Sequence, residues 1–315
     1  MSKTIRTCCL KHLLFSALIF LSTSNYLSAQ ELDDFDPEYT YEIGLQVGAN
    51  AFLGDLGGNL GIGKNFAKDY MSKTARPLLG LSFTYYPKYW YNITGGVNYT
   101  NLVGADSLID NKNGYEKWRY NRNLSFRSTI WEGYISTEIF PLSAINQDNS
   151  LSRIRPYLGL GIGVFHFNPQ AQYKGQWVDL RPLHLEGEGF PQYPNSKEYS
   201  LTQFYIPLSA GLRFAINPKL SVSTGIIFRY TFTDYIDDVS QTYVDPKYFD
   251  IYFANDPTNA ALAKALYSRS KTPQKVKPGV DRADRHGNNR DSYTTVFLSL
   301  RYAFDHKAHY SIGYW

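Results

Sequence analysis

The chain contains little of several residue types, and each shortage narrows what the protein can be. Only two of its 315 residues are cysteine, Cys8 and Cys9, and only two are methionine. No run of apolar residues approaches the roughly 20 that a membrane-spanning helix needs. Because both cysteines lie among the first ten residues, the rest of the chain has no thiol for a disulfide or a cysteine metal site.

The first 29 residues have the pattern of a cleaved export signal. A basic region with Lys3, Arg6 and Lys11 comes first, a short apolar run at 13–21 follows, and small residues precede the expected cleavage site. We therefore expect the mature chain to begin at Gln30. Loss of the three basic residues lowers the formal net charge from +4 to +1, since no acidic residue leaves with them. A charge this balanced requires no nucleic acid or other polyanion as a partner.

What the chain does contain is aromatic and glycine residues arranged in alternating segments. Aromatic residues make up 16% of it, including 27 tyrosines, and there are 24 glycines. In the first segment Ile43, Leu45 and Val47 alternate with Glu42 and Gln46, so apolar and polar side chains point to opposite faces. Eight segments show this period of two: 42–53, 79–85, 91–99, 131–139, 158–164, 206–214, 222–230 and 296–304. The pattern predicts an all-β fold, a transmembrane antiparallel outer-membrane β-barrel of about eight strands.

The connections between these segments alternate in length. Short links at 87–88 and 217–218 contrast with long polar ones, and 141–153 is the only longer link on the short side. This asymmetry predicts short periplasmic turns and long extracellular loops. The long links are 54–75, 104–124, 168–204 and 233–290. The expected organisation is a signal peptide at 1–29, a periplasmic arm at 30–40, the barrel at 41–304 and a periplasmic tail at 305–315.

Charged residues also occur on the face that is expected to point into the barrel. An eight-stranded barrel has an interior just wide enough to be filled by side chains. Since three of these residues are acidic and three are basic, we expect internal salt bridges and no pore. The candidate network consists of Glu42, Glu132, Glu138, Arg213, Arg229 and Arg301.

Residues with catalytic or metal-binding chemistry are present, but in no recognisable spacing. His166, His184 and Glu186 match no hydrolase or metal motif. Aspartates stand at both ends of the longest loop, yet without the ligand spacing of a calcium loop we expect solvated charges that pair in part with Arg282 and Arg285. These aspartates are Asp234, Asp237, Asp238, Asp281, Asp284 and Asp291. We expect no enzyme activity, no metal and no cofactor, and a short surface helix at the alanine-rich segment 259–267.

Short motifs stand where the expected loops meet the strands. They are Phe52-Leu53-Gly54-Asp55-Leu56, Arg76-Pro77 with Gly80, the stretch 121–128 with Asn123 and Arg127, and Gly279, Asp281-Arg282 and Asp291-Ser292-Tyr293. In their order and position these motifs resemble the PorG-like family. The resemblance implies an outer-membrane barrel of the type IX secretion and gliding apparatus that anchors a periplasmic ring of PorK/PorN-like proteins to the outer membrane. The positions that carry it most closely are Gly54, Asp55, Asn123, Arg127, Asp281 and Arg282.

If this role holds, the working surface faces the periplasm and includes the arm, the turn at 141–153 and the tail. The arm is acidic and would suit a basic partner, although a disordered spacer after the signal peptide is the other reading of such a segment. The candidate partner contacts are Asp33, Asp34, Asp36 and Glu38.

Two other functions remain open from the sequence. One is a generic OmpA-like barrel that stabilises the envelope or binds a ligand through its long loops, in which case changes in the loops matter more than changes in the turns. The other is an outer-membrane hydrolase of lipid or peptide, in which case a single histidine or aspartate substitution abolishes activity without unfolding the barrel. All three hypotheses place the protein in the outer membrane.

Overall fold

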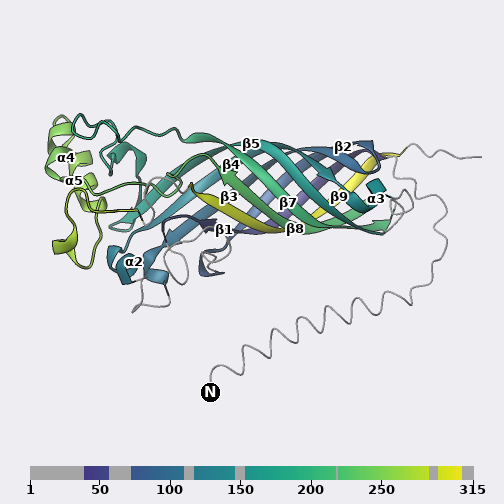
Figure 1. Ribbon diagram of the computed structural model, residues 1–315, viewed down its shortest axis with the longest axis horizontal. Helices are drawn as coiled ribbons and strands as arrows, with labels where there is room; N and C mark the ends of the chain where they lie inside the picture. The colour runs from purple at the N-terminus through teal and green to yellow at the C-terminus, as the bar shows by residue number, and fades with distance from the viewer. Residues whose placement is uncertain are drawn as a thin grey trace, which may run out of the picture. The chain divides into compact units, whose positions relative to one another are not determined.

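The computed structural model describes residues 39–56, 72–109, 117–145, 153–217, 219–283 and 290–306 (Figure 1). The predicted signal peptide, the acidic residues Asp33, Asp34, Asp36 and Glu38, and most of the predicted tail lie outside these residues. The described strands are β1 (Tyr39–Leu53), β2 (Arg76–Lys88), β3 (Tyr91–Ala105), β4 (Ser125–Ile139), β5 (Ile154–Tyr173), β6 (Gln176–Asp179), β7 (Thr202–Asn217), β8 (Leu220–Thr231) and β9 (Ser292–His306).

Eight of these strands form a closed antiparallel barrel. The sheet runs in the order β4-β3-β2-β1-β9-β8-β7-β5, and a further pairing of β4 with β5 closes it. The first and last strands meet along their length, with Leu45 opposite Leu300. The ninth strand, β6, pairs only with the far end of β5 and extends it as a hairpin. The fold predicted from the alternating segments is therefore confirmed.

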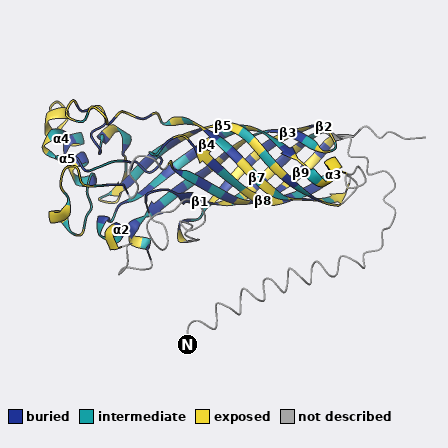
Figure 2. Ribbon diagram, in the orientation of Figure 1, coloured by how far each residue is buried: buried dark blue, intermediate teal, exposed yellow. Residues whose placement is uncertain are grey.

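The barrel is apolar outside and polar inside. Outward side chains such as Leu79, Leu81 and Val97 are 56–57% exposed, whereas Glu42 is 4% and Arg229 1% exposed. Figure 2 shows buried and exposed positions alternating along the strands. This distribution is the reverse of that in a water-soluble protein and suits an apolar surface that faces lipid. Strands of 12 to 20 residues exceed the roughly 9–11 that cross a bilayer, so the barrel is longer than the membrane is thick.

Aromatic side chains gather on the outside of the barrel near one end. Tyr41, Phe83, Tyr85 and Phe304 lie with neighbouring ring centroids 5.4–6.1 Å apart on three adjacent strands. Aromatic rings on the outer surface near an end of a barrel form the girdles that are typical of the boundary between lipid and water.

The helices lie at the two ends of the barrel (Figure 1). At the end that we call the long-loop end are α2 (Lys117–Arg122), α4 (Lys247–Tyr252) and α5 (Pro257–Leu266), and at the opposite, short-turn end is α3 (Pro141–Ile145). Within the described residues, no helix is both long and apolar enough to cross a bilayer. The surface helix expected at 259–267 is confirmed as α5, which begins where the Asp256 side chain accepts from the Asn259 N–H at 3.0 Å.

Four long loops connect the strands at the long-loop end. Loop 1 joins β1 to β2, loop 2 joins β3 to β4, loop 3 joins β5 to β7 and contains β6, and loop 4 joins β8 to β9. Loops 3 and 4 share a small core of their own, in which Leu183, Leu185 and Phe190 pack with Phe249 and Leu266. The loops are thus folded structures and not only connections.

The inside of the barrel changes character toward the long-loop end. There the inward positions are aromatic or aliphatic, and Ile130, Phe165, Phe167 and Tyr293 are completely buried. Phe165 packs edge-on against Tyr293, with ring centroids 6.2 Å apart. This group, which we call the mouth cluster, closes the barrel below the loops. The expectation of a lumen that is polar throughout is therefore wrong at this end, because the inward positions next to the loops bury apolar side chains.

The strand boundaries also differ from those expected. β1 begins at Tyr39 and β9 ends at His306, so the barrel takes two residues from the expected arm at 30–40 and two from the expected tail at 305–315. β5 continues to Tyr173, six residues into the segment 168–204 expected to be loop 3. Hairpin pairing with β6 prolongs β5 past Val164, and the outward positions there carry the polar residues His166, Asn168 and Gln172, so the apolar alternation does not mark this part of the strand.

Candidate functional site

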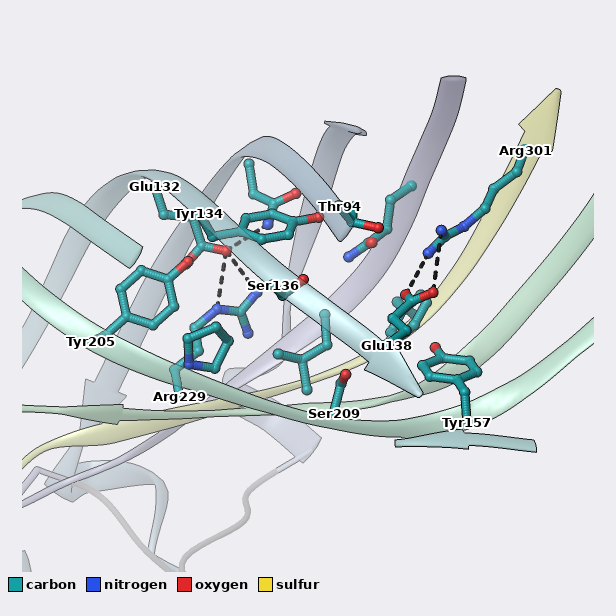
Figure 3. A pocket seen from close by; sticks show the side chains of 15 residues that line it. Thr94, Glu132, Tyr134, Ser136, Glu138, Tyr157, Tyr205, Ser209, Arg229 and Arg301 are labelled. Carbon is teal, nitrogen blue, oxygen red and sulfur yellow. Dashed lines mark hydrogen bonds and ion pairs between the residues drawn. The ribbon is translucent and has the colours of Figure 1, made fainter. Parts of the chain in front are cut away.

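The first of two buried groups of charged residues inside the barrel is centred on Glu132. Arg229 donates to its Oε1 through Nη2 at 2.7 Å and through Nε at 3.0 Å. Tyr293 donates its hydroxyl to Oε2 at 2.6 Å, and Asn98 donates its amide to Oε1 at 2.6 Å. Figure 3 shows Arg229 and Glu132 meeting from β8 and β4, which are not neighbours in the sheet. The group therefore connects separate parts of the barrel wall.

The second group lies around Glu138, nearer the short-turn end of the strands. Arg213 donates to Glu138 at 2.9 Å and to Glu42 at 3.2 Å. Arg301 donates to the other Glu138 oxygen at 2.8 Å, and Asn92 donates to Oε2 at 2.8 Å. Two arginines and two glutamates thus share one network across β1, β4, β7 and β9.

All six residues of the candidate lumen network lie within these two groups, and none is more than 6% exposed. The space left between the side chains in Figure 3 is about 30 Å³, room for one or two water molecules. Within these two groups three carboxylates face three guanidinium groups, so their formal charges balance. With the mouth cluster above it, the interior has the dimensions of a packed core and not of a channel. The six are Glu42, Glu132, Glu138, Arg213, Arg229 and Arg301.

A further set of buried ion pairs ties the long loops together. In loop 2, Arg122 donates to both oxygens of Asp106, each at 2.8 Å. The same guanidinium donates to the carbonyl of Asp55 in loop 1 at 2.6 Å and to that of Arg282 in loop 4 at 2.7 Å. One buried side chain therefore holds three of the four loops.

Arg282 extends this contact to loop 3. Its Nη1 donates to Glu186 at 3.0 Å and to the carbonyl of Asp238 at 2.5 Å. Glu186 also accepts from the backbone N–H groups of Ser240 and Gln241 at 3.0–3.1 Å. Burial raises the pKa of Glu186, and Arg282 opposes that rise. We call Asp106, Arg122, Glu186, Asp238 and Arg282 the loop network.

Several carboxyl groups beside this network lie close together with little positive charge. Asp237 is completely buried and accepts from the N–H groups of Leu56 and Val239, each at 3.1 Å. Burial raises the pKa of Asp237 well above its usual value, and Asp55 and Asp234 raise it further. The pKa of Asp291 is likewise well above normal, first through burial and then through Asp237 and Asp234. These groups therefore hold protons at pH values where exposed carboxyl groups have lost them.

The residues with the family-like motifs have structural contacts at the base of the loops. Gly54 has no room for a side chain, because an added Cβ would overlap Asp291 and the ring of Phe52. Asn123 adopts a φ of 60° and donates to the carbonyl of Arg269 at 3.2 Å. Arg127 donates to Gln170 at 2.9 Å and lies 3.8 Å from the centre of the Trp177 ring.

The two residues of the motif Asp281-Arg282 make different kinds of contact. Asp281 forms an isolated backbone bridge with Thr242, while the adjacent Arg282 belongs to the loop network. The structure therefore brings Asp55, Asp281 and Arg282 into one region and leaves Arg127 on the wall between β4 and β5.

The expectation that the charged loop residues are solvated is wrong for most of them. Asp237, Asp238, Asp291 and Arg282 are all 1% exposed or less. Asp106 binds Arg122, which is 16 residues away, and Glu186 binds Arg282, which is 96 residues away. No motif or spacing in the sequence marks Asp106 as a partner of an arginine. For Glu186 the sequence shows only an acidic loop residue whose spacing matches no hydrolase or metal motif. Only the folding of loops 2, 3 and 4 against one another brings these charges together and removes water from them. Asp284 and Arg285 lie outside the described residues.

The two histidine side chains that the structure describes, His166 and His184, form no hydrogen bond to these acids. His184 Nδ1 lies 2.7 Å from the carbonyl of Glu188, and burial lowers the pKa of the imidazole. His166 is on β5 and its Nδ1 lies 3.1 Å from the hydroxyl of Thr202. In the part of the chain that the structure describes, no three histidine, cysteine or acidic residues are grouped as metal ligands.

No protein-family model and no curated protein matches the chain. Among solved structures it is similar to the neisserial surface protein A, with 10% identity over 84% of this chain and 96% of the other and a TM-score of 0.35. Ail of Yersinia pestis has 9% identity over 84% of this chain and 99% of the other, with a TM-score of 0.35. The outer-membrane enzyme PagL has 13% identity over 84% of this chain and 99% of the other, with a TM-score of 0.30. At these identities and TM-scores the likenesses carry no argument about function, and the barrel rests on its own strand pairing.

Proposed function

We propose that this protein is a non-enzymatic structural barrel of the outer membrane that anchors the periplasmic PorK/PorN-like ring of the type IX secretion machinery. The proposal combines the motif resemblance with two features of the fold. One is the way in which the motifs meet in space, and the other is the filled interior.

The contacts among the motif residues are the observation that carries the proposal. Arg122, from the motif at 121–128, donates to the carbonyls of Asp55 and Arg282, which belong to the first and last motifs. These residues are 67 and 160 positions apart in the chain. Three motifs that matched by chance would have no reason to meet in space. That these three join one buried network indicates that they belong to a common architecture. This supports the family resemblance from which the secretion role follows.

The interior of the barrel supports a structural role over conduction. The two charged groups and the mouth cluster fill the lumen, and the pocket between the charged groups has a volume of only about 30 Å³, so the lumen offers no route for a folded or unfolded chain. Any part in secretion is then played by the ends of the barrel. At the short-turn end, α3 presents Leu142 and Ile145, which are 50% and 83% exposed. In the orientation expected of outer-membrane barrels this end faces the periplasm, where an anchored ring would bind.

The test is recovery of partners from the native membrane. A tagged copy is mildly crosslinked in cells, the outer membrane is gently solubilised, and co-purifying proteins are identified by mass spectrometry. We expect the periplasmic ring components. In a deletion strain we expect secreted cargo to accumulate in the periplasm while the membrane stays intact. Normal secretion without the protein would refute the proposal.

A matched pair of variants locates the contact. Leu142→Glu with Ile145→Glu places charges at the short-turn end, and Ile251→Glu places one on an exposed residue of α4 at the long-loop end. We expect the first variant to lose the ring components and the second to keep them, with both barrels folded. The opposite result would favour the generic barrel that works through its loops.

A further inference from the structure

A cavity lies at the long-loop end, outside the barrel lumen. It has a volume of about 350 Å³ and is bordered by α2, by Tyr243 and by the segment 270–280 of loop 4. We propose that this loop pocket binds an anionic saccharide. The inference rests on the pocket alone and does not depend on the role in secretion.

The charge of the pocket selects an anion. Lys117 and Lys275 border it and are exposed, Arg122 lies in its wall, and none of its ten lining residues is acidic. The segment 269–282 carries five basic residues and one acidic residue. Because Arg122 already binds Asp106, the charge offered to a ligand comes mainly from the two ammonium groups. Ammonium groups at the rim of a concave site bind carboxylate or phosphate groups as point charges.

The uncharged lining suits a sugar better than a simple ion. Trp118 borders the cavity and is 37% exposed, so part of its ring is open to a ligand. The hydroxyls of Ser270 and Thr272 lie 3.4 Å apart, and the amide of Asn121 lines the same cavity. A saccharide presents C–H groups that pack on an aromatic ring and hydroxyls that exchange hydrogen bonds with such groups. A pocket of a few hundred Å³ with a few convergent polar groups is of the size that holds one or two sugar rings.

The walls of the pocket are held in place without a ligand. The N–H of Lys271 donates to the carbonyl of Asn121 at 2.8 Å, which joins loop 4 to α2. The backbone N–H of Tyr243 donates to the carbonyl of Val280 at 2.8 Å, and the carbonyl of Tyr243 accepts from the N–H of Gly279 at 2.9 Å. A site formed in advance loses less conformational entropy on binding. In the expected orientation this end faces outward, where anionic sugars occur both free and linked to lipid.

The test uses the full barrel folded in detergent micelles and two sugar probes of equal length. Tetragalacturonate carries a carboxylate on each ring, and maltotetraose is uncharged. We expect calorimetry to show binding of tetragalacturonate at least about tenfold tighter than that of maltotetraose, weakening with added salt. The variant Lys117→Gln/Lys275→Gln should lose about tenfold or more in affinity for tetragalacturonate, and Trp118→Ala should weaken both probes.

The control variant Lys174→Gln/Lys247→Gln removes the same charge from exposed lysines away from the pocket and should bind as the unaltered protein does. Folding of each variant is checked by its heat-dependent mobility on a gel. Equal affinity for the two probes, or no loss in the Lys117→Gln/Lys275→Gln variant, would overturn the proposal. Binding to lipopolysaccharide vesicles but not to phospholipid vesicles assigns the sugar to a lipid, and binding of the free probe alone assigns it to a soluble saccharide. Binding of neither form also overturns it.

Discussion

Arg282 donates to Glu186 at 3.0 Å, and neither side chain is more than 1% exposed. The two residues belong to loops 4 and 3, and the same guanidinium also donates to the carbonyl of Asp238 at 2.5 Å. A buried ion pair of this kind is costly to break from one side, because the remaining partner keeps its charge without compensation. Because the ion pair joins loops 3 and 4 and not the barrel strands, we expect its loss to release the loops while the barrel stays closed.

Loss of the Arg282 side chain should loosen the loops and spare the barrel. We expect Arg282→Gln to destabilise the loop structure by about 3–5 kcal/mol, because Glu186 and Asp238 then remain buried without their cation. Limited proteolysis should cut loop 4 faster than in the unaltered protein, while heat-dependent mobility on a gel stays that of a folded barrel. Lys264→Gln, which removes an exposed ion pair with Asp250, serves as the control and should change little. Equal cleavage of the two variants would contradict the role assigned to the network.

The lumen network should respond differently to single and double replacement. Glu132→Gln leaves the buried charge of Arg229 without its carboxylate partner. We expect the free energy of unfolding of the barrel to fall by about 3–5 kcal/mol. Replacement of both residues by apolar ones of similar size, Glu132→Leu/Arg229→Met, should recover much of that loss. Denaturant unfolding of the barrel in micelles measures both. A double variant that is less stable than the single one would show that the ion pair itself contributes net stability.

Stability of the loops should fall as the pH rises. Burial raises the pKa of Asp238 to about 7 and holds those of Asp237 and Asp291 well above normal. Between the ordinary carboxyl pKa of about 4 and these raised values, the unfolded chain has lost protons that the folded loops still hold. The folded state then binds more protons, so stability decreases with increasing pH across this range.

Thermal unfolding followed by intrinsic fluorescence at pH 5 and pH 8 tests this. We expect a lower melting temperature at pH 8 and a smaller difference in Asp237→Asn and Asp291→Asn, since an amide keeps an acceptor but does not ionise. Asp256→Asn is the matched control, because asparagine also caps a helix and Asp256 lies on the surface at the start of α5. An unchanged pH dependence in the two buried variants would mean that other groups cause it.

The apolar belt predicts where a charge is not tolerated. Ile135 is 60% exposed in the middle of the outward face of β4, between Trp131 and Ile139. We expect Ile135→Arg to destabilise the folded barrel in a lipid bilayer by about 2–4 kcal/mol. Ile251 is 61% exposed on α4, beyond the barrel, and Ile251→Arg should shift stability by less than about 0.5 kcal/mol. Similar losses in the two variants would show that β4 does not face lipid.

The sequence predicts the structure of the barrel much better than that of the loops. Alternation at period two identified all eight barrel strands, since lipid selects apolar side chains at every second position whatever the neighbouring strand is. The same parity placed Glu42, Glu132 and Arg213 inside, and a narrow lumen leaves such charges no partner except one another. Phe165 and Phe167 also follow this parity, but nothing in the alternation marks where a polar lumen ends and the mouth cluster begins.

For the loops, the sequence identified residues but not their contacts. Asn123, Asp281 and Arg282 were singled out by resemblance, while the partners of the two network arginines, Asp106 and Glu186, were not. Whether an aspartate such as Asp237 is solvated or buried depends on which loops pack over it. Loop sequences have no periodic pattern from which that packing could be predicted. Local periodicity was thus enough to establish a barrel with a lipid-facing surface. The buried loop network and the loop pocket exist only through contacts between segments as far as 160 residues apart, which form when the barrel brings the four loops to one end.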